Sequence, residues 1–285
     1  MEFKYKDINV YYEVIGDGKP VIMLHGYCVD CRIMKGCMEP IFSKRKGYKR
    51  IYIDLPCMGQ SEHSETIDSS DTFLDFTIEF INNVIPGENF LIAGQSFGGY
   101  LARGIVYKMK ERVDGVIMIC PVIVPKYKKR DVPAHKVLIR DQKLLDSLPT
   151  DDAKKFDDTA VIENEQIYKR YKAEVASGLD LAYYPILTYI KRNTYDFTFN
   201  VENREKGYFD KPALILLGRQ DSCVGYKDAL KIIGNYPRAT IAILDKAGHN
   251  LQIEQEQLFN MHVNQWISSV EKYCKNQEYD GLEYI

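Results

Sequence analysis

Short runs of apolar residues recur along the chain, and most are followed by a stretch with the spacing of a helix. The run at 9–15 alternates apolar and polar positions and is rich in aromatic and β-branched residues, which is typical of a strand. Apolar runs with little or no interruption indicate strands buried on both faces, and they lie at 21–24, 51–55, 90–93, 116–120, 213–217 and 240–244. Helical spacing lies at 33–43, 71–84, 99–110, 226–233 and 253–273. This alternation predicts an α/β fold with a mostly parallel central sheet and helices on both faces.

The pattern changes after the run at 116–120. Strand runs disappear, and charged residues, tyrosines and helical spacing take their place, notably at 166–175 and 179–192. Pro185 lies inside the second stretch and predicts a kink or a break. A segment of this length is too long for an ordinary connection, so it is expected to be functional. The expected division is a core domain and a mostly helical insertion: 1–121 with 208–285, and 122–207.

Length and composition are those of an ordinary soluble protein. The 285 residues are 45% hydrophobic and 27% charged. The net charge of −2 provides no basic surface that would favour nucleic acid or an anionic membrane. No apolar run is long enough to span a bilayer, and the first residues carry no secretory signal.

Seven cysteines are scattered along the chain, an odd number in a sequence rich enough in apolar residues for a good core. This usage fits reduced thiols in a cytoplasm rather than a disulfide framework. Cys28 and Cys31 have the spacing of half a zinc site, but no second C-x-x-C pair and no H-x-x-x-H accompanies them. We therefore expect structural thiols and no bound metal.

One of the apolar runs ends in a motif with chemical meaning. After 90–93 comes Gly94-Gln95-Ser96-Phe97-Gly98, a G-x-S-x-G pattern, and helical spacing begins directly afterwards. A serine on a tight turn between a strand and a helix has strained backbone angles that expose its hydroxyl. Glycines are needed on either side because side chains would collide where the strand and the helix cross.

A serine hydroxyl is a weak nucleophile unless a base accepts its proton and a third group holds the base. Of the five histidines, His249 directly follows the last apolar run and precedes the last helix. Asp221 directly follows the preceding run. The carboxyl ends of parallel strands meet at one edge of a sheet, so both side chains are expected beside Ser96. Their order along the chain is Ser, Asp, His.

With these residues identified, the chain resembles a capped, esterase-like serine hydrolase of the α/β-hydrolase superfamily. The resemblance covers nearly the whole chain. Five short segments carry it: His25-Gly26, the stretch DLPCMGQS at 54–61, the Ser96 motif, Gly218-Arg219-Gln220-Asp221 and Gly248-His249.

The resemblance implies a role for each of these residues. Ser96 is the implied nucleophile, His249 the base, and Asp221 the acid that holds the base. The oxyanion hole would consist of the backbone N–H groups of Tyr27 and Phe97. Residues 122–207 would be the cap, and neither a metal nor an organic cofactor is implied.

The substrate preference is less defined. The chain departs from the usual pattern at Cys57 and Met58, and Cys28 lies beside the implied oxyanion loop. The tyrosines of the cap segment, at 183, 184, 189 and 195, are more often packing residues than substrate contacts. The substrate contacts that we expect are His25, Cys28, Tyr184 and Leu187.

Each catalytic assignment has a plainer alternative. Ser96 alone fits a turn serine, His249 a solvated loop histidine and Asp221 a helix cap. Their shared sheet edge and their order favour the catalytic interpretation. His25 also fits a structural role, with its ring bonded to backbone around the oxyanion loop, and Asp54 fits a loop stabiliser.

The resemblance implies hydrolysis of a carboxylic ester or thioester of a small, largely apolar acyl group through an acyl-enzyme. The strand-to-helix turn that carries Ser96 is called the nucleophile elbow. A serine at this elbow argues against those members of the superfamily whose nucleophile is an aspartate. Alternatives among enzymes are an amide or C–C hydrolase, or a peptidase similar to proline iminopeptidase, although the loop after His25-Gly26 lacks Gly-Pro-Gly. An alternative of another class is a small-molecule receptor with vestigial hydrolase activity. We expect a cytoplasmic monomer or homodimer with a small-molecule substrate, and neither nucleic acid nor a membrane as partner.

Overall fold

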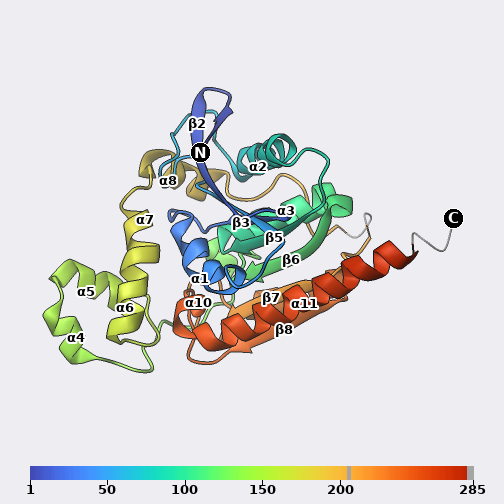
Figure 1. Ribbon diagram of the computed structural model, residues 1–285. Coiled ribbons are helices and arrows are strands. Elements are labelled where there is room, and N and C mark those ends of the chain that lie inside the picture. The colour runs from blue at the N-terminus through green and yellow to red at the C-terminus, as the bar shows by residue number, and fades with distance from the viewer. Residues whose placement is uncertain (204–206, 281–285) are drawn as a thin grey trace.

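A computed structural model describes residues 1–203 and 207–280, the last four of them by their backbone alone. Within these residues lies an eight-stranded sheet in the order β1-β2-β4-β3-β5-β6-β7-β8 (Figure 1). β1 pairs antiparallel with β2 and β2 antiparallel with β4, whereas all pairs from β4 to β8 are parallel. The strands are β1 Glu2–Tyr5, β2 Ile8–Ile15, β3 Lys19–Leu24, β4 Tyr48–Ile53, β5 Phe90–Gln95, β6 Val113–Ile119, β7 Ala213–Gly218 and β8 Ala239–Leu244.

The central strands are buried on both faces. Every residue of β5, β6 and β7 is buried, which agrees with the apolar runs in the sequence. β8 closes the sheet and is mostly half-buried. The predicted α/β fold with a mostly parallel sheet is confirmed.

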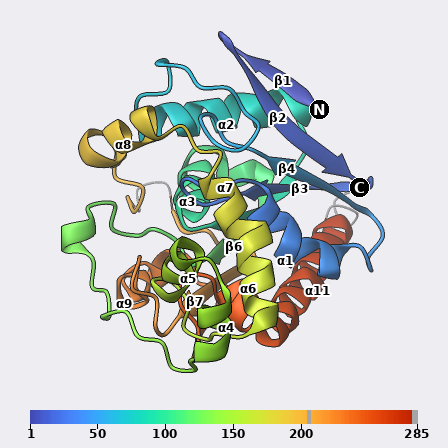
Figure 2. The ribbon, with the colours of Figure 1, turned by 90° about the vertical axis from the view of Figure 1, so that its left-hand side faces the viewer.

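Helices cover both faces of the sheet. α1 packs against α11, and α2 packs against α3. Figure 2 shows the first pair on one side of the strands and the second pair on the other. None of the described helices is long and apolar enough to cross a membrane. These helices are α1 Arg32–Phe42, α2 Ser70–Val84, α3 Phe97–Met109 and α11 Glu256–Asp280, with the short α9 Lys227–Leu230 and α10 Leu251–Glu254 on either side of β8.

The chain between β6 and β7 adds several further helices. We call residues 122–207 the β6–β7 segment, and Figure 1 shows α4 to α7 of this segment beside one end of the sheet. Its helices are α4 Gln142–Ser147, α5 Thr150–Asp157, α6 Glu165–Tyr171, α7 Ser177–Leu179 and α8 Tyr184–Asn193, with a π-helical turn at Lys172–Ala176. Short 3-10 turns lie at Tyr127–Lys129 in this segment and at Lys110–Arg112 and Ile233–Asn235 outside it.

The helical stretch expected at 179–192 is broken, as Pro185 suggested, but the break lies before the proline. The chain leaves the helical conformation after α7 and re-enters it at α8, where Pro185 lies in the first turn. Proline is tolerated in a first turn because the leading N–H groups of a helix have no partner within it. Pro185 therefore helps to begin a helix instead of kinking one.

A buried ion pair fastens the β6–β7 segment to the core. The Arg170 guanidinium donates to both carboxylate oxygens of Glu174, at 2.7 and 3.0 Å, and to the backbone carbonyl of Gly36 in α1, at 3.2 Å. A Cβ on Gly36 would lie only 2.2 Å from the Glu174 carboxyl carbon. Glycine at this position is what permits the close approach.

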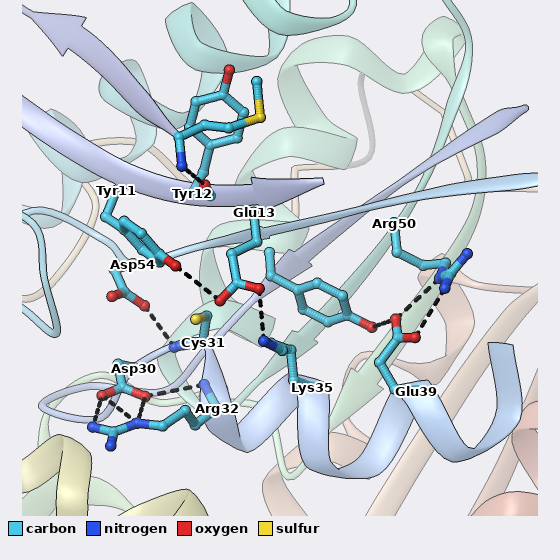
Figure 3. A network of polar contacts seen from close by, with 12 residues as sticks. Tyr11, Tyr12, Glu13, Asp30, Cys31, Arg32, Lys35, Glu39, Arg50 and Asp54 are labelled. Atoms are coloured by element: carbon cyan, nitrogen blue, oxygen red, sulfur yellow. Dashed lines mark hydrogen bonds and ion pairs between the residues drawn. The ribbon is translucent and has the colours of Figure 1, made fainter. Parts of the chain in front are cut away.

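A second polar network fixes the loop between β3 and α1 (Figure 3). Glu13 of β2 accepts hydrogen bonds from Lys35 of α1, at 2.7 Å, and from the Tyr11 hydroxyl, at 3.1 Å. Asp54 accepts from the backbone N–H of Cys31, at 2.8 Å, and of Gln60, at 2.9 Å. Asp54 is thus a loop stabiliser. The loop that it holds runs directly on from Tyr27 and Cys28.

Candidate active site

Ser96 lies at the junction of β5 and α3 with a φ of +52°. Residues other than glycine rarely adopt a positive φ, so the backbone at this turn is strained. The Ser96 N–H donates to the Ile119 carbonyl at 2.9 Å, and the Ser96 carbonyl accepts from Tyr100 and Val122 at 3.1 and 3.0 Å. These bonds to α3 and to the end of β6 hold the strained turn in place.

The two motif glycines are required by close packing. A Cβ on Gly94 would lie 2.2 Å from the Gly98 carbonyl oxygen, and a Cβ on Gly98 would lie 2.2 Å from the Leu24 carbonyl oxygen. Distances below about 3 Å are not compatible with a real Cβ. The G-x-S-x-G pattern therefore reflects the crossing of β5, β3 and α3 behind Ser96.

Asp221 and His249 are hydrogen-bonded to each other. The Nδ1 atom of His249 lies 2.9 Å from Oδ2 of Asp221. The other oxygen of Asp221 accepts from the backbone N–H groups of Cys223, at 2.8 Å, and Val224, at 3.0 Å. The Asp221 carboxylate is fully buried, whereas 23% of the His249 side chain is exposed. This arrangement fixes the ring and directs Nε2 away from Asp221.

Residues 245–250, between β8 and α10, carry His249, and we call them the histidine loop. Hydrogen bonds hold this loop from two sides. The Gly248 N–H donates to Oε2 of Glu254 at 2.6 Å, and the Val161 N–H of the β6–β7 segment donates to Oε1 of the same carboxylate at 2.7 Å. From the elbow strand, the Gln95 amide donates to the His249 carbonyl at 3.3 Å. Burial raises the pKa of Glu254 despite these N–H groups. One buried carboxylate thus joins the loop of His249 to the β6–β7 segment.

The pKa of Asp221 is lowered and the pKa of His249 is raised, and their mutual contact contributes to both shifts. Burial raises the pKa of Asp221, but the charge of His249 and the N–H groups outweigh it and hold the pKa below its usual value. Burial lowers the pKa of His249, but the Cys223 thiol and the Asp221 carboxylate outweigh it and raise the pKa well above 6.5. The geometry therefore favours the pair of charges, carboxylate and imidazolium.

The thiols of Cys120 and Cys223 lie near this pair, Cys28 lines the same cavity as His249, and none of the seven cysteines forms a disulfide. Burial raises the pKa of Cys28 to about 11 and that of Cys120 to about 12. Burial also acts to raise the pKa of Cys223, but the charge of His249 reverses the effect and lowers it. Cys223 is therefore the thiol most strongly linked to the histidine.

Ser96 and His249 line one cavity of about 510 Å³. This volume is in the usual range for a small-molecule site. The Ser96 hydroxyl makes no direct hydrogen bond to His249 among the described residues, and such bonds are often long in ligand-free sites. Apolar and aromatic side chains make up much of the wall: Val29, Ile33, Val122, Val175 and Leu179, with Tyr27, Tyr127, Tyr184 and Tyr195.

Two backbone N–H groups are available beside Ser96. Phe97 is the first residue of α3, so its N–H has no partner within the helix. Neither this N–H nor that of Tyr27 donates a hydrogen bond within the described part of the chain. The Tyr27 ring contacts the Phe97 ring edge-on at 5.0 Å, and its hydroxyl donates to the Leu187 carbonyl at 2.8 Å. The two amides thus come from loops that pack together.

Two of the expected substrate contacts lie elsewhere. His25 is fully buried and outside the cavity wall. Its Nδ1 lies 2.7 Å from the Gly26 carbonyl, and its Nε2 accepts from the Leu55 N–H at 2.8 Å. Leu187 is 1% exposed and packs in the core. Both expectations are wrong because these side chains support the loops around the cavity and do not reach into it. Cys28 and Tyr184 do line it.

Three residues of the site were not found from the sequence. Gln95 and Glu254 bind the histidine loop through backbone groups, and no sequence pattern marks such contacts. Tyr195 lines the cavity although it is only 8% exposed. The sequence shows Tyr195 among the tyrosines of the cap segment, but it does not show toward which side of the segment the side chain points.

Among the residues that the structure describes, two groups of side chains lie close enough together to act as metal ligands. Cys120, Asp221 and His249 offer atoms within 4.8 Å of one another, as do Asp30, Cys31 and Asp54. In each group the carboxylates already accept hydrogen bonds, as described for Asp221 and Asp54. Asp30 is bound by the Arg32 side chain at 2.9 Å. These occupied oxygens do not favour either group as a metal centre.

Comparison with known proteins identifies the family to which this fold belongs. A family model described as serine aminopeptidase, S33, matches residues 18–256. The chain is 24% identical over 269 residues to the AB hydrolase superfamily protein YisY of Bacillus subtilis, covering 92% of this chain and 96% of that one. It is 31% identical over 111 residues to a pimeloyl-[acyl-carrier protein] methyl ester esterase of Shewanella woodyi, covering 39% of each.

Solved structures give the same result. An α/β superfamily hydrolase from Oenococcus oeni PSU-1 aligns with a TM-score of 0.85 and 31% identity, covering 95% of this chain and 99% of that one. A thermophilic esterase from Thermogutta terrifontis shares the fold, with a TM-score of 0.67 and 17% identity over 92% of this chain and 94% of its own. The family match spans β3 to β8, with Ser96, Asp221 and His249, and the chain therefore belongs to the α/β-hydrolase superfamily.

Proposed function

We propose that this protein is a serine hydrolase that cleaves a carboxylic ester or thioester through an acyl-enzyme. The observation that carries the proposal is the 2.9 Å contact between His249 and Asp221 at a cavity that Ser96 also lines. In the proposed reaction, Oγ of Ser96 attacks the carbonyl carbon and its proton passes to Nε2 of His249. His249 then protonates the leaving alcohol or thiol, and water hydrolyses the acyl-enzyme by the same steps.

The backbone N–H groups of Tyr27 and Phe97 are the proposed oxyanion hole. Both lack a partner among the described residues, so they can donate to the negative oxygen that forms when Ser96 attacks. Donors that are fixed before the reaction stabilise this charge without reorganisation. Removing one such donor in other enzymes costs about 100-fold to 1,000-fold in kcat.

The proposed acyl group is small and largely apolar, since apolar and aromatic side chains form much of the cavity wall. We also propose that residues 122–207 act as a cap over the nucleophile. Leu179 and Tyr184 of this segment line the same cavity as Ser96. The similarity to a pimeloyl-[acyl-carrier protein] methyl ester esterase, 31% identical over 111 residues, supports an ester as the target.

The family description makes an aminopeptidase the second candidate. An aminopeptidase holds the ammonium group of its substrate, and a carboxylate is the usual partner for such a charge. Among the described residues of the cavity wall, Asp158 is the acidic one, and Arg130 and Lys191 oppose it with two positive charges. This balance disfavours a cationic substrate and keeps the ester as the first choice.

Turnover of p-nitrophenyl butyrate tests the proposal. The wild type should hydrolyse it, and Ser96→Ala should reduce kcat by at least about 1,000-fold because the nucleophile is lost. Ser222→Ala is the matched control, since Ser222 lines the same cavity away from the elbow, and it should retain most of the activity. Alanine-p-nitroanilide tests the aminopeptidase. Faster turnover of this amide than of the ester would reverse the order of the two candidates.

A further inference from the structure

The wall of the catalytic cavity carries an excess of positive charge. Arg130 and Lys191 line it, and Asp158 is its one acidic residue among those described. Neither cation forms an ion pair with a carboxylate within the described part of the chain. Other described cations of the β6–β7 segment either form ion pairs, as Lys126 does with Asp196 at 3.2 Å, or are exposed to solvent. The cavity wall therefore carries two positive charges without an acidic partner in the described ranges, which favours the binding of an anion.

Arg130 is fixed before any ligand binds. Its Nε, Nη1 and Nη2 atoms each donate one hydrogen bond to a backbone carbonyl, of Val124, Cys223 and Pro125, at 2.7, 3.0 and 2.9 Å. A guanidinium has five N–H donors, so these three bonds leave two donors over. Its carbon also lies 5.7 Å from the centre of the Tyr127 ring. The charge is half-buried, oriented and without an acidic partner.

The hydroxyl of Tyr195 is a second unsatisfied group in this wall. Tyr195 is 8% exposed and its ring stacks on Phe97 at 5.2 Å, yet its hydroxyl forms no hydrogen bond among the described residues. Burial raises the pKa of this hydroxyl, and the charge of Arg130 opposes the rise. The hydroxyl oxygen keeps contact with solvent. A ligand atom in the cavity would replace water as its partner.

Lys191 of α8 lines the cavity on the side of Tyr27 and Cys28, away from Arg130. Burial raises the pKa of the Cys28 thiol, and the charge of Lys191 opposes this effect. Lys191 is exposed in the ligand-free cavity, so its ammonium is free to turn toward a bound anion. The two cations therefore approach the cavity from the His249 side and from the Tyr27 side.

We propose that Arg130, Lys191 and the Tyr195 hydroxyl form an anion subsite, and that the natural substrate is an ester bearing a carboxylate remote from the reacting carbonyl. This inference rests on the proposed function and names its substrate class. The apolar wall takes the methylene groups next to the carbonyl, and the subsite takes the charged end. A carboxylate accepts hydrogen bonds from a guanidinium, an ammonium and a hydroxyl alike.

A pair of esters with the same shape and different charge tests the subsite. Mono-p-nitrophenyl glutarate ends in a carboxylate, and p-nitrophenyl 5-methylhexanoate carries an isopropyl group of similar shape in its place. We expect the wild type to favour the glutarate by at least about 25-fold in kcat/KM after subtraction of the uncatalysed rate. Each of the two uncompensated charges contributes about fivefold at contact distance in water, and the Tyr195 hydroxyl adds to this. Sodium chloride should reduce this preference.

A second pair asks which part of the ester carries the charge. 4-Acetoxybenzoate has its carboxylate in the leaving group, and 4-isopropylphenyl acetate is the neutral partner. A preference in the glutarate pair assigns the subsite to the acyl side, and a preference in the acetate pair assigns it to the leaving-group side. Either preference supports the subsite, and equal or reversed rates in both pairs overturn it.

Variants connect the preference to the three residues. Lys191→Gln should lower the preference for the charged ester by about fivefold, because one positive charge is lost. Tyr195→Phe should lower it by about tenfold, because one hydroxyl donor is lost. Arg130→Gln should lower it, and Arg130→Lys should restore much of it. Arg192→Gln is the matched control, because Arg192 is the next residue of α8 and is outside the cavity wall.

The outcomes separate the two proposals. If neither member of either pair is hydrolysed faster by the wild type than by Ser96→Ala, the proposed function fails. If the neutral esters are hydrolysed as fast as the charged ones, the function stands and the subsite fails. A preference that is unchanged in Lys191→Gln, Tyr195→Phe and Arg130→Gln also overturns the subsite.

Discussion

At the scale of single residues, the proton of His249 decides when the proposed reaction can run. Burial lowers its pKa, but Cys223 and Asp221 raise it, and the net pKa lies well above 6.5. A general base works only when it is neutral. The value of kcat/KM for a neutral activated ester should therefore rise with pH through a midpoint above 6.5. A pH–rate profile measures this, and a midpoint below 6.5 contradicts the role of His249 as base.

Cys223 provides a way to move that midpoint. Burial acts to raise the pKa of this thiol, but the charge of His249 lowers it, so the two groups stabilise each other's charged forms. Cys223→Ser removes a negative partner of the ring. We expect the midpoint to fall by about one pH unit while the maximal kcat is kept, because a neighbouring unit charge changes a pKa by about this much.

The control for this variant is Cys274→Ala in α11, which lies outside the cavity wall. The same pH–rate profile is recorded for both. If Cys223→Ser and Cys274→Ala have the same midpoint as the wild type, the thiol has no influence on His249. If Cys223→Ser is folded and inactive, the thiol takes part in the chemistry itself.

At the scale of elements, Glu254 connects the histidine loop to the β6–β7 segment. Its two oxygens accept from Gly248 and Val161. Glu254→Gln replaces one acceptor by an amide that faces an N–H group, so one bond is lost. We expect kcat to fall roughly tenfold with little change in KM, because a misplaced base slows the reaction more than it weakens binding.

Thermal unfolding and steady-state kinetics check this together. Glu256→Gln is the control, since Glu256 pairs with Arg170 at 3.5 Å and has no bond to the histidine loop. A loss of stability in Glu254→Gln with a kcat equal to that of the control would show that Glu254 supports the fold and does not position His249.

Most of the sheet could be predicted because its strands are buried on both faces, which leaves a strong apolar pattern. The edge strand β1 was harder to predict from the sequence. β1 has two exposed residues among its four and gives no pattern, so it was missed. The stretch 226–233 has helical spacing, but only Lys227–Leu230 forms α9. Local spacing overstated this helix because short helices depend on tertiary packing.

At the scale of the whole molecule, the proposed cap should set the length of acyl chain that fits. Tyr184 lines the cavity, so Tyr184→Ala should shift the fall in kcat/KM to longer p-nitrophenyl esters. Each methylene that fits contributes about 0.8 kcal/mol, or about fourfold. Leu187→Ala is the contrast, because Leu187 is buried in the core. It should cost about 2–5 kcal/mol of stability and leave the length profile unchanged.

Ester series from acetate to decanoate give this profile. An unshifted profile in Tyr184→Ala, together with a shift in Cys28→Ala, would move the control of chain length from residues 122–207 to the core domain.

The candidate site could be predicted to the extent that its residues follow strands. Ser96, Asp221 and His249 come directly after β5, β7 and β8, and parallel strands bring these positions to one edge. The positions of His25 and Leu187 could not be derived, since burial and side-chain direction depend on the packing of the whole molecule. The same holds for Tyr195, which lines the cavity from a segment without a strand pattern.

The central claim is that Ser96 is the nucleophile, and labelling with a fluorophosphonate tests it most directly. The account predicts one adduct per chain, on the peptide that contains Ser96, and none in Ser96→Ala. Labelling should also slow at low pH, as His249 becomes protonated. An adduct on another residue, or an equal rate of labelling in Ser96→Ala, would contradict the account.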